Sequence, residues 1–280
     1  MNIKILSDST CDLSAEILAQ YNIDVMPLTV IKDDVSYLDN VTITPAEIFA
    51  HVEAGGNLCS TTAVSIGEYL EFFGRFADKY DALVHINLGS GFSSSYQNAC
   101  LAAEDFDNVI TIDSQNLSTG QGLVVLEACR LAKAAQSLEQ LKADLIAYTE
   151  KVESSFLVDK LTYLAKGGRC SSAAALGANL LNLKPCIEVK NGKMTVVKKY
   201  RGNYSKCLAS YVKDRLADRE DLDMTNLFVT QTKVSDDCHA AVMEAVNNYS
   251  AFENVYNTTA GCTISCHCGP GTLGILFVRK

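Results

Sequence analysis

The first half of the chain alternates short apolar runs with longer stretches in which apolar residues recur at helical spacing. The apolar runs cover residues 2–7, 23–30, 82–88 and 109–113. In the second run, Pro27 indicates an edge strand or a bulge, because proline cannot donate a hydrogen bond to a neighbouring strand. Ser14 is placed to cap a helix that ends near Tyr21. Strands that alternate with helices are typical of a parallel sheet with helices on both faces.

Further helix starts are indicated by the capping-box pattern, a hydroxyl residue followed three positions later by Glu or Gln. This pattern occurs at residues 44–47, 65–68 and 137–140. At the first of these, Pro45 also suits the opening position of a helix, where the missing N–H is not needed. We therefore predict an α/β fold for this half of the chain.

After about residue 154 the pattern changes. A strand at 156–158 is followed by a region of small residues, 160–182, that we expect to be helical. Two runs then flank Asn191-Gly192, a dipeptide that strongly favours a β-hairpin. The remaining expected elements are helices at 205–218 and 235–249 and strands at 226–231 and within 254–278. Hairpins combined with crossovers predict a mixed sheet, so we divide the chain into an N-terminal parallel-sheet α/β domain, 1–154, and a C-terminal mixed-sheet α/β domain, 155–280.

The composition is that of a globular protein: 48% of the 280 residues are hydrophobic and 20% are charged. The net charge is -9, with 24 basic against 33 acidic residues, and the basic groupings are short, as at 198–201. Nucleic acid is therefore not an expected partner, because phosphate backbones require a basic patch. No apolar run approaches the roughly 20 residues of a membrane span, and the N-terminus turns polar too early for a signal peptide. We expect a cytoplasmic protein.

The chain contains eleven cysteines, an odd number, and most of them lie among apolar residues. We expect reduced, structural thiols, since disulfides are rare in the cytosol. Cys262, Cys266, His267 and Cys268 resemble a metal cluster. If 263–268 is a strand, however, His267 points away from the face that Cys266 and Cys268 share. We therefore expect neither a metal nor a cofactor.

The segments that follow the expected strands are rich in hydroxyl groups and glycine. They are residues 7–10, 59–65, 89–96, 113–114 and 118–122, and they are poor in Lys, His and Glu. A single Ser or Thr in such a place is most simply a helix cap. In open α/β sheets, however, ligands bind beyond the carboxyl ends of the strands, and hydroxyls and helix N-termini favour anions. Several such loops at one sheet edge predict a site for a carboxylate or a phosphate.

Two enzymatic alternatives use the same region. Ser93 follows Gly91-Phe92 after a strand, as in a nucleophile elbow, although Ser95 stands where the second glycine belongs. With His267 as the base, this arrangement would give an acyl-ester hydrolase. A sugar- or nucleotide-phosphate enzyme would need a metal or a base that the sequence does not reveal.

One arginine and three histidines remain to be assigned a functional or a structural role. The segment 166–169 follows a helical stretch, so it is no phosphate loop, and we expect Gly167 to be a left-handed helix cap. Arg169 would then be exposed, which makes it a candidate functional residue. We expect His51 and His239 on the surface and His85 as a hydrogen-bonded core residue.

Taken together, these segments resemble the DegV family of bacterial lipid-binding proteins. The matching segments, in order along nearly the whole chain, are 7–13 (Ser-Asp-Ser-Thr-Cys-Asp-Leu), Thr61-Thr62 before 65–68, 93–97 (Ser-Ser-Ser-Tyr-Gln), 159–161 leading to 166–169 (Lys-Gly-Gly-Arg), 181–185 (Leu-Asn-Leu-Lys-Pro), and His267 before Gly269-Pro270-Gly271. Each segment is weak alone, and their order and spacing make the resemblance specific.

The resemblance implies two α/β domains that hold one long-chain fatty acid in a tunnel between them. It implies that Thr62 and Ser93 hydrogen-bond the fatty acid carboxylate, with Thr61 nearby and His267 completing this network. Arg169, Arg201 and Ser9 would have supporting or partner-facing roles, Arg201 on a docking surface for a kinase.

The implied activity is non-enzymatic. The protein would present the carboxylate to a separate ATP-dependent fatty acid kinase, which forms an acyl phosphate for phospholipid synthesis, and it would contact membranes transiently. Two departures from the family pattern concern the loops: Ala63-Val64 stands in place of Gln-Pro, and Ser94 in place of Gly. Because Pro and Gly restrict or free the backbone, these changes bear on loop geometry and acyl preference.

Overall fold

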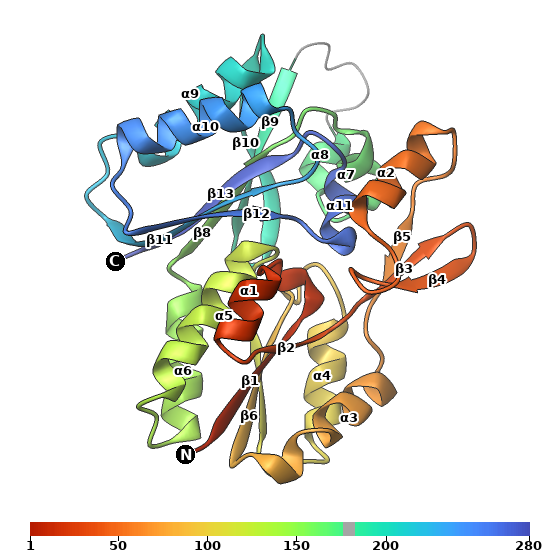
Figure 1. Ribbon diagram of the computed structural model, residues 1–280, viewed down its shortest axis with the longest axis vertical. Helices are drawn as coiled ribbons and strands as arrows, with labels where there is room; N and C mark the ends of the chain where they lie inside the picture. Colours follow the sequence, from red (N-terminus) through yellow and green to blue (C-terminus); the bar gives the residue numbers. More distant parts are fainter. Residues whose placement is uncertain (176–182) are drawn as a thin grey trace.

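The computed structural model describes residues 1–175 and 183–280, which form three sheets and the helices around them (Figure 1). The first sheet is wholly parallel, with the strand order β2-β1-β6-β7. Its strands are β1 (Ile3–Asp8), β2 (Asp24–Met26), β6 (Ala82–Asn87) and β7 (Val109–Asp113). Adjacent residues of β1 enter different apolar clusters, Leu6 on one face and Ile5 on the other. The expected α/β half with both faces of its sheet covered is therefore confirmed.

The helices of this half are α1 (Ala15–Gln20), α2 (Pro45–Glu53), α3 (Ile66–Gly74), α4 (Ser95–Ala103), α5 (Thr119–Ala132) and α6 (Leu138–Thr149), with short 3₁₀ turns η1 (Ser9–Cys11) and η2 (Ala77–Lys79). Of these, α1, α2, α3 and α6 begin where the sequence predicts. Complete capping boxes open α2 at Thr44 and α3 at Ser65. At α6, Ser137 accepts a hydrogen bond from the backbone N–H of Gln140. Local cap chemistry thus places these helix starts.

The single strand expected at 23–30 is wrong. Pro27 separates β2, at the edge of the parallel sheet, from β3 (Thr29–Lys32), which belongs to another sheet. This small sheet has the order β4-β3-β5, with β4 (Val35–Leu38) and β5 (Ser60–Thr62) both antiparallel to β3. The proline interrupts the ladder, and the chain leaves the first sheet at that point.

The second half builds a six-stranded mixed sheet, as predicted. Its order is β10-β9-β8-β13-β11-β12, and among the described strands of this sheet the β11–β12 pair is parallel and the other pairs are antiparallel. The strands are β8 (Val152–Leu157), β9 (Leu183–Lys190), β10 (Lys193–Arg201), β11 (Leu222–Gln231), β12 (Asn254–Thr259) and β13 (Leu273–Arg279). Asn191 and Gly192 both have positive φ, as the hairpin between β9 and β10 requires.

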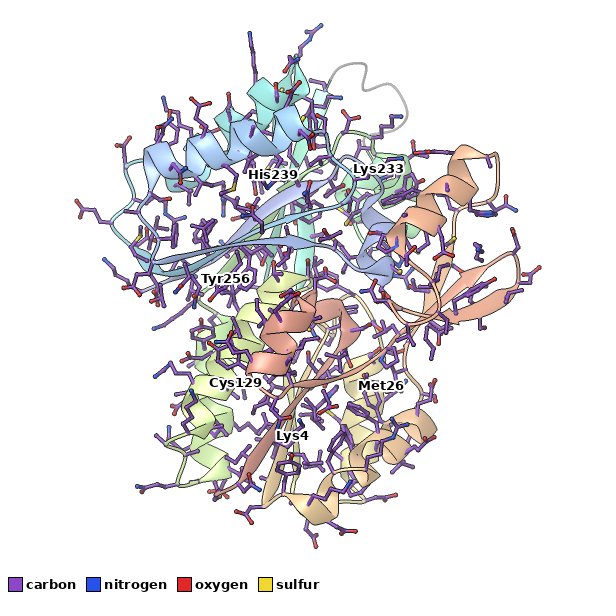
Figure 2. All side chains as sticks on the ribbon, viewed as in Figure 1. Lys4, Met26, Cys129, Lys233, His239 and Tyr256 are labelled. Atoms are coloured by element: carbon purple, nitrogen blue, oxygen red, sulfur yellow. The ribbon has the colours of Figure 1, made fainter. Side chains whose placement is uncertain are left out.

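The six-stranded sheet lies between two helical layers (Figure 1). Helices α9 (Tyr204–Leu216) and α10 (Asp236–Tyr249) cover one face. The opposite face packs against the first half of the chain, where Phe228 and Leu276 join the same apolar cluster as Leu123 of α5. Side chains of the sheet and of the layers on either side extend into the spaces between them (Figure 2). The division at residue 154 stays a prediction, and that residue lies within β8.

The expectation of a strand at 263–268 is wrong: residues Cys262–Cys268 form helix α11. Backbone N–H groups at its start donate to carboxylates far away in the sequence, Asp12 and Asp39. Such long-range partners satisfy the first turn of a helix but leave no local sequence pattern. Helix α11 packs beside α2, β5 and α7 (Thr162–Gly167).

Part of the expected helical region 160–182, including Leu181 and Asn182, lies outside the described residues. The described part contains α7 and a short helix α8 (Ser171–Ala175). The left-handed cap after α7 is Gly168 and not Gly167, so that prediction was wrong by one position. Gly167 is the last residue of the helix itself.

His85 is fully buried and its Nε2 lies 3.0 Å from Asp8 Oδ1, which confirms a hydrogen-bonded core histidine. His51 and His239, expected at the surface, are half-buried. His239 lies on α10 and contacts Asn257 Oδ1 at 2.9 Å (Figure 2). Within the described ranges, no helix combines the length and the apolar character that a membrane span needs.

Candidate functional site

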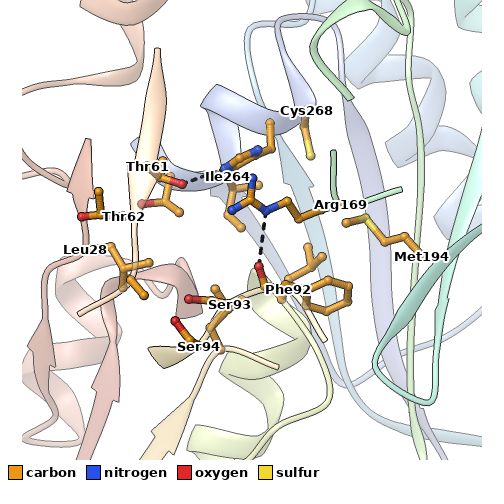
Figure 3. Close-up of a pocket in the computed structure, with 15 residues that line it drawn as sticks. Leu28, Thr61, Thr62, Phe92, Ser93, Ser94, Arg169, Met194, Ile264 and Cys268 are labelled. Carbon is orange, nitrogen blue, oxygen red and sulfur yellow. Dashed lines mark hydrogen bonds between the residues drawn. The ribbon is translucent and has the colours of Figure 1, made fainter. Parts of the chain in front are cut away.

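A cavity of about 160 Å³ lies where the loops after the parallel strands meet α11 and β10 (Figure 3). Hydroxyl groups, one cation and one imidazole form the polar part of its wall: Thr61, Thr62, Ser93, Ser94, Thr263, Arg169 and His267. The larger apolar residues of the wall are Leu28, Leu88, Phe92, Leu117, Met194 and Ile264. The site therefore combines hydrogen-bond donors with an apolar lining, as small-molecule sites usually do.

Not every hydroxyl-rich segment contributes to this cavity. Ser7 donates to the Ile86 carbonyl, Thr10 donates to Gln121, and Ser114 donates to the Asn116 carbonyl. These hydroxyls hold the strand ends together and are unavailable to a ligand. The β5 pair Thr61-Thr62 and the loop between β6 and α4 remain, and the structure brings these two segments to one wall.

Ser93 lies in the loop that precedes α4. Its Oγ is 2.9 Å from Ser95 Oγ and accepts a hydrogen bond from the Ser95 backbone N–H at 3.2 Å. Ser94, the residue before α4, makes no side-chain cap bond. The Ser93 hydroxyl is thus held in place from one side, with its other side toward the cavity (Figure 3).

His267 lies on α11 and faces Thr61, with Nε2 2.8 Å from Thr61 Oγ1. Burial, together with the positive charge of Arg169, lowers the pKa of His267 to about 4. At neutral pH the imidazole is therefore uncharged, and it orients the Thr61 hydroxyl without adding positive charge. Among the described residues, no hydrogen bond joins His267 to Ser93, the pair that a hydrolase would need.

Arg169 is the one formally positive side chain among the described residues of the wall. It is exposed, as predicted, and its Nε donates to the Phe92 carbonyl at 3.4 Å (Figure 3). Its Nη1 donates to the Gly167 carbonyl at 2.9 Å. Gly167 must be small, because a Cβ there would lie 2.7 Å from His267 Nδ1.

Two of the predicted residues lie outside the wall of the cavity. Ser9 is buried; it donates to Asp39 Oδ2 at 2.9 Å and accepts from the Leu28 backbone N–H at 3.2 Å. It therefore supports Leu28 of the wall indirectly. Arg201 is exposed at the end of β10. The structure brings together Thr61, Thr62, Ser93, Arg169 and His267, and their roles in binding stay predictions.

A smaller inner cavity of about 30 Å³ adjoins the first and shares Leu117, Ile264 and Cys268 with it. Its wall continues over the face of the six-stranded sheet, including Phe156 and Leu276. Several hydroxyls of this wall form hydrogen bonds with other groups of the protein; Thr232, for example, donates to the Gly269 carbonyl at 2.9 Å. The space thus leads from hydroxyl groups into the region between the two sheets.

Sequence reasoning missed the apolar wall and Thr263. Met194 reaches the cavity because the β9–β10 hairpin returns to the loop between β6 and α4, residues 88–94, where Gly91 packs directly on Gly192. We call residues 88–94 the serine loop. The hairpin signal at Asn191-Gly192 was visible in the sequence, but the partner of its turn was not. Thr263 was missed because the helical conformation of its segment was missed.

The cysteine side chains contribute to the packing of the protein interior. All eleven are free; ten are buried and Cys100 is half-buried. Cys262 Sγ, for example, donates to the Ile43 carbonyl at 3.2 Å. Within residues 1–175 and 183–280, no group of three or more His, Cys, Asp or Glu side chains is arranged to hold a metal ion.

Comparisons with known proteins match the whole chain. The profile of the family described as "Uncharacterised protein, DegV family" matches residues 2–280. A DegV domain-containing protein of Clostridium acetobutylicum is 30% identical over 282 residues, covering 99% of both chains.

Solved structures agree in fold. The chain is similar to a DegV family protein of Thermus thermophilus, whose structure is described as showing fatty acid binding, with a TM-score of 0.92, 29% identity and complete coverage of both chains. It is also similar to DegV of Bacillus subtilis, described as a fatty acid binding protein, with a TM-score of 0.82, 27% identity and complete coverage of both chains. With two α/β halves, a site between their sheets and a family match from residue 2 to residue 280, this chain belongs to the DegV family.

Proposed function

We propose that this protein binds one long-chain fatty acid between its two sheets and presents the carboxylate to a separate ATP-dependent kinase. The observation that carries the proposal is the cavity itself, which has hydroxyls at one end and continues past Leu117 and Ile264 into the inner cavity. Relatives of known structure are described as fatty acid binding proteins. This combination suits a molecule with one anionic end and an apolar body.

The head group would be held by Thr62 and Ser93, with Thr61 and His267 completing the network. Burying a carboxylate is costly unless several donors satisfy it, and clustered hydroxyls supply them. Arg169 adds a positive charge close to the same wall. Because it is exposed and lies next to the serine loop, it would also stand near the point where a partner meets the carboxylate.

The protein itself would be no catalyst. Phosphoryl transfer depends on positioning and on metal-bound ATP, which the kinase would supply. The product would be an acyl phosphate for phospholipid synthesis. Arg201, exposed on β10, belongs in this proposal to the surface that meets the kinase, and Ser9 to the support of the wall. We place the protein in the cytoplasm of a bacterium, with transient membrane contact when the lipid is loaded.

Mass spectrometry of the freshly purified protein tests the binding proposal. We expect the native spectrum to show one small ligand on each chain, and organic extraction to identify it as a fatty acid. A protein that is empty and takes up no added fatty acid would contradict the proposal. Labelling of Ser93 by a fluorophosphonate probe would favour the acyl-ester hydrolase instead.

The roles of the hydroxyls are tested by Thr62→Ala and Ser93→Ala. Each is expected to weaken fatty acid affinity by roughly ten- to a hundredfold, since a hydrogen bond to a charged group contributes roughly 1.5–3 kcal/mol. Ser90→Ala is the matched control: Ser90 lies in the same loop, but its hydroxyl donates to Asp113 at 2.6 Å. Unchanged affinity in both test variants would remove these residues from the carboxylate site.

The kinase proposal is tested by a pull-down with a candidate kinase from the same cell. We expect Arg201→Glu to reduce kinase capture and leave fatty acid binding unchanged, because Arg201 lies outside the cavity wall. A wild-type protein that binds the lipid and captures no kinase would count against the second half of the proposal.

A further inference from the structure

Helix α11 supplies a large share of the cavity wall. Thr263, Ile264, His267 and Cys268 all come from its seven residues. Thr263 is only 3% exposed, and its Oγ1 has no hydrogen-bond partner in the described part of the chain. A buried hydroxyl without a partner is costly, and a polar atom of a ligand in the cavity would satisfy it. What holds α11 in place therefore bears directly on ligand binding.

Two buried carboxylates from the first forty residues hold the start of α11. The Gly261 backbone N–H donates to Asp12 Oδ1 at 2.8 Å, and the Cys262 backbone N–H donates to Asp39 Oδ1 at 2.7 Å. Asp12 and Asp39 are 5% and 1% exposed. The first N–H groups of a helix have no acceptor within the helix, so these two carboxyl oxygens satisfy donors that would otherwise be left unpaired. A helix this short depends on such partners for its position.

The second oxygen of each carboxylate is bound to another part of the wall. Asp12 Oδ2 accepts from the Ser118 hydroxyl at 2.6 Å, and Ser118 follows Leu117, which lines both cavities. Ser118 has a φ of 53°, an unfavourable value for serine that this contact helps to hold. Asp39 Oδ2 accepts from Ser9, which in turn holds Leu28. Each carboxylate thus joins α11 to a second wall segment.

We propose that Asp12 and Asp39 are positioning residues for ligand binding, which hold α11 so that Thr263 and His267 face the ligand head group. Neither carboxylate lines the main cavity. This inference rests on the proposed function in one respect, the nature of the ligand. It adds two determinants of affinity that never touch that ligand.

Asparagine is the closest substitute for Asp12, because the Asp12 side chain is mostly uncharged at neutral pH. Burial, with a further contribution from the nearby Asp39 charge, raises the pKa of Asp12 to about 8. The side chain is therefore mostly protonated at neutral pH. In Asp12→Asn, the amide oxygen still accepts from Gly261, and the amide nitrogen beside Ser118 donates to the Ser118 hydroxyl oxygen, so that residue 12 keeps both of its links.

The test compares Asp12→Ala, Asp39→Ala and Asp12→Asn with a matched control, Glu153→Gln. Glu153 is a partly buried carboxylate on β8 that pairs with Arg215 and Arg219, and among the described residues it makes no hydrogen bond to α11. Palmitate binding is measured by calorimetry on the delipidated full-length protein. We expect affinity to fall about tenfold in both alanine variants, to stay within about threefold of wild type in Asp12→Asn, and to be unchanged in Glu153→Gln.

A second readout follows the position of α11 directly. The His267 imidazole is titrated by NMR in each variant, without ligand. Its low pKa depends on burial, so a displaced α11 should raise the pKa toward the ordinary value in the alanine variants but not in Glu153→Gln. If an alanine variant does not fold, Ser9→Ala and Ser118→Ala remove only the second link of each carboxylate and should produce smaller shifts in the same direction.

The outcomes separate this inference from the proposed function. Folded alanine variants with wild-type palmitate affinity and an unchanged His267 titration would overturn the positioning role. A wild-type protein that binds no palmitate would defeat the proposed ligand, while the His267 titration would still decide whether the two carboxylates position α11.

Discussion

At the scale of single residues, two buried ionisable groups have shifted pKa values, and both shifts keep the group uncharged in the folded protein near neutral pH. Asp12 is held largely protonated, and His267 is held neutral. Both shifts arise mainly from burial, which disfavours the charged form of either group. The two shifts change the free energy of unfolding in opposite directions as the pH rises. The contribution of each group must therefore be measured by comparing a variant that lacks it with wild type.

For Asp12, the folded protein binds more protons than the unfolded chain between the ordinary pKa of 3.8 and about pH 8. The contribution of this group to the free energy of unfolding therefore falls as the pH rises through that window. Asp12→Asn cannot ionise, so we expect the difference in stability between variant and wild type to shift in favour of the variant from pH 5 to pH 8. Urea denaturation at several pH values measures it, and a constant difference would contradict the shift.

For His267, the folded protein binds fewer protons than the unfolded chain between about pH 4 and the ordinary pKa of 6.5. The free energy of unfolding should therefore fall as the pH is lowered through that window. We expect His267→Gln to lose less stability than wild type between pH 7 and pH 5. Equal losses in thermal denaturation would show that His267 is not kept neutral.

At the scale of elements, the serine loop and the β9–β10 hairpin are in direct backbone contact. A Cβ at Gly91 would collide with the carbonyl oxygen of Gly192. Both elements carry wall residues, Ser93 in the loop and Met194 in the hairpin. Separating them should therefore widen the cavity as well as disturb the packing.

We expect Gly91→Ala to reduce the free energy of unfolding by about 1–3 kcal/mol, the usual cost of forcing extra atoms into a packed site. Fatty acid affinity should fall with it, because Ser93 and Met194 move apart. Gly67→Ala on α3 is the control: nothing lies within 4 Å of a Cβ there, and alanine favours a helix. Equal stabilities of the two variants by urea denaturation would show that the loop and the hairpin do not touch.

At the scale of the whole molecule, a ligand between the sheets should stabilise both halves together. A ligand that binds only the folded state adds about 2.7 kcal/mol at a concentration 100 times its dissociation constant. We expect palmitate to raise the melting temperature of the delipidated protein. Hexadecanol, the alcohol of equal chain length, should raise it far less, because it lacks the carboxylate that the hydroxyls would satisfy. Equal shifts would mean that no carboxylate site exists.

Much of the fold was predictable because its determinants are local. Capping boxes at Thr44 and Ser65 mark helix starts from four adjacent residues, and Asn191-Gly192 marks a turn from two. The small sheet around β3 was not predictable, since Pro27 shows only that one strand ends there. Helix α11 was missed because its first N–H groups bind Asp12 and Asp39, more than 220 positions away in the sequence.

The sequence by itself determined the α/β class, several element boundaries, the family resemblance and the hydroxyl residues Thr61, Thr62 and Ser93 as candidates. Only the tertiary structure decided which hydroxyls face a cavity, since Ser7, Thr10 and Ser114 look the same in sequence but donate to internal partners. It also decided that His267 is uncharged, that Arg169 meets the serine loop and that Ser9 donates a hydrogen bond to Asp39. The physical reason is common to all of these: burial and hydrogen-bond partnership depend on segments brought together by packing, which no local pattern records.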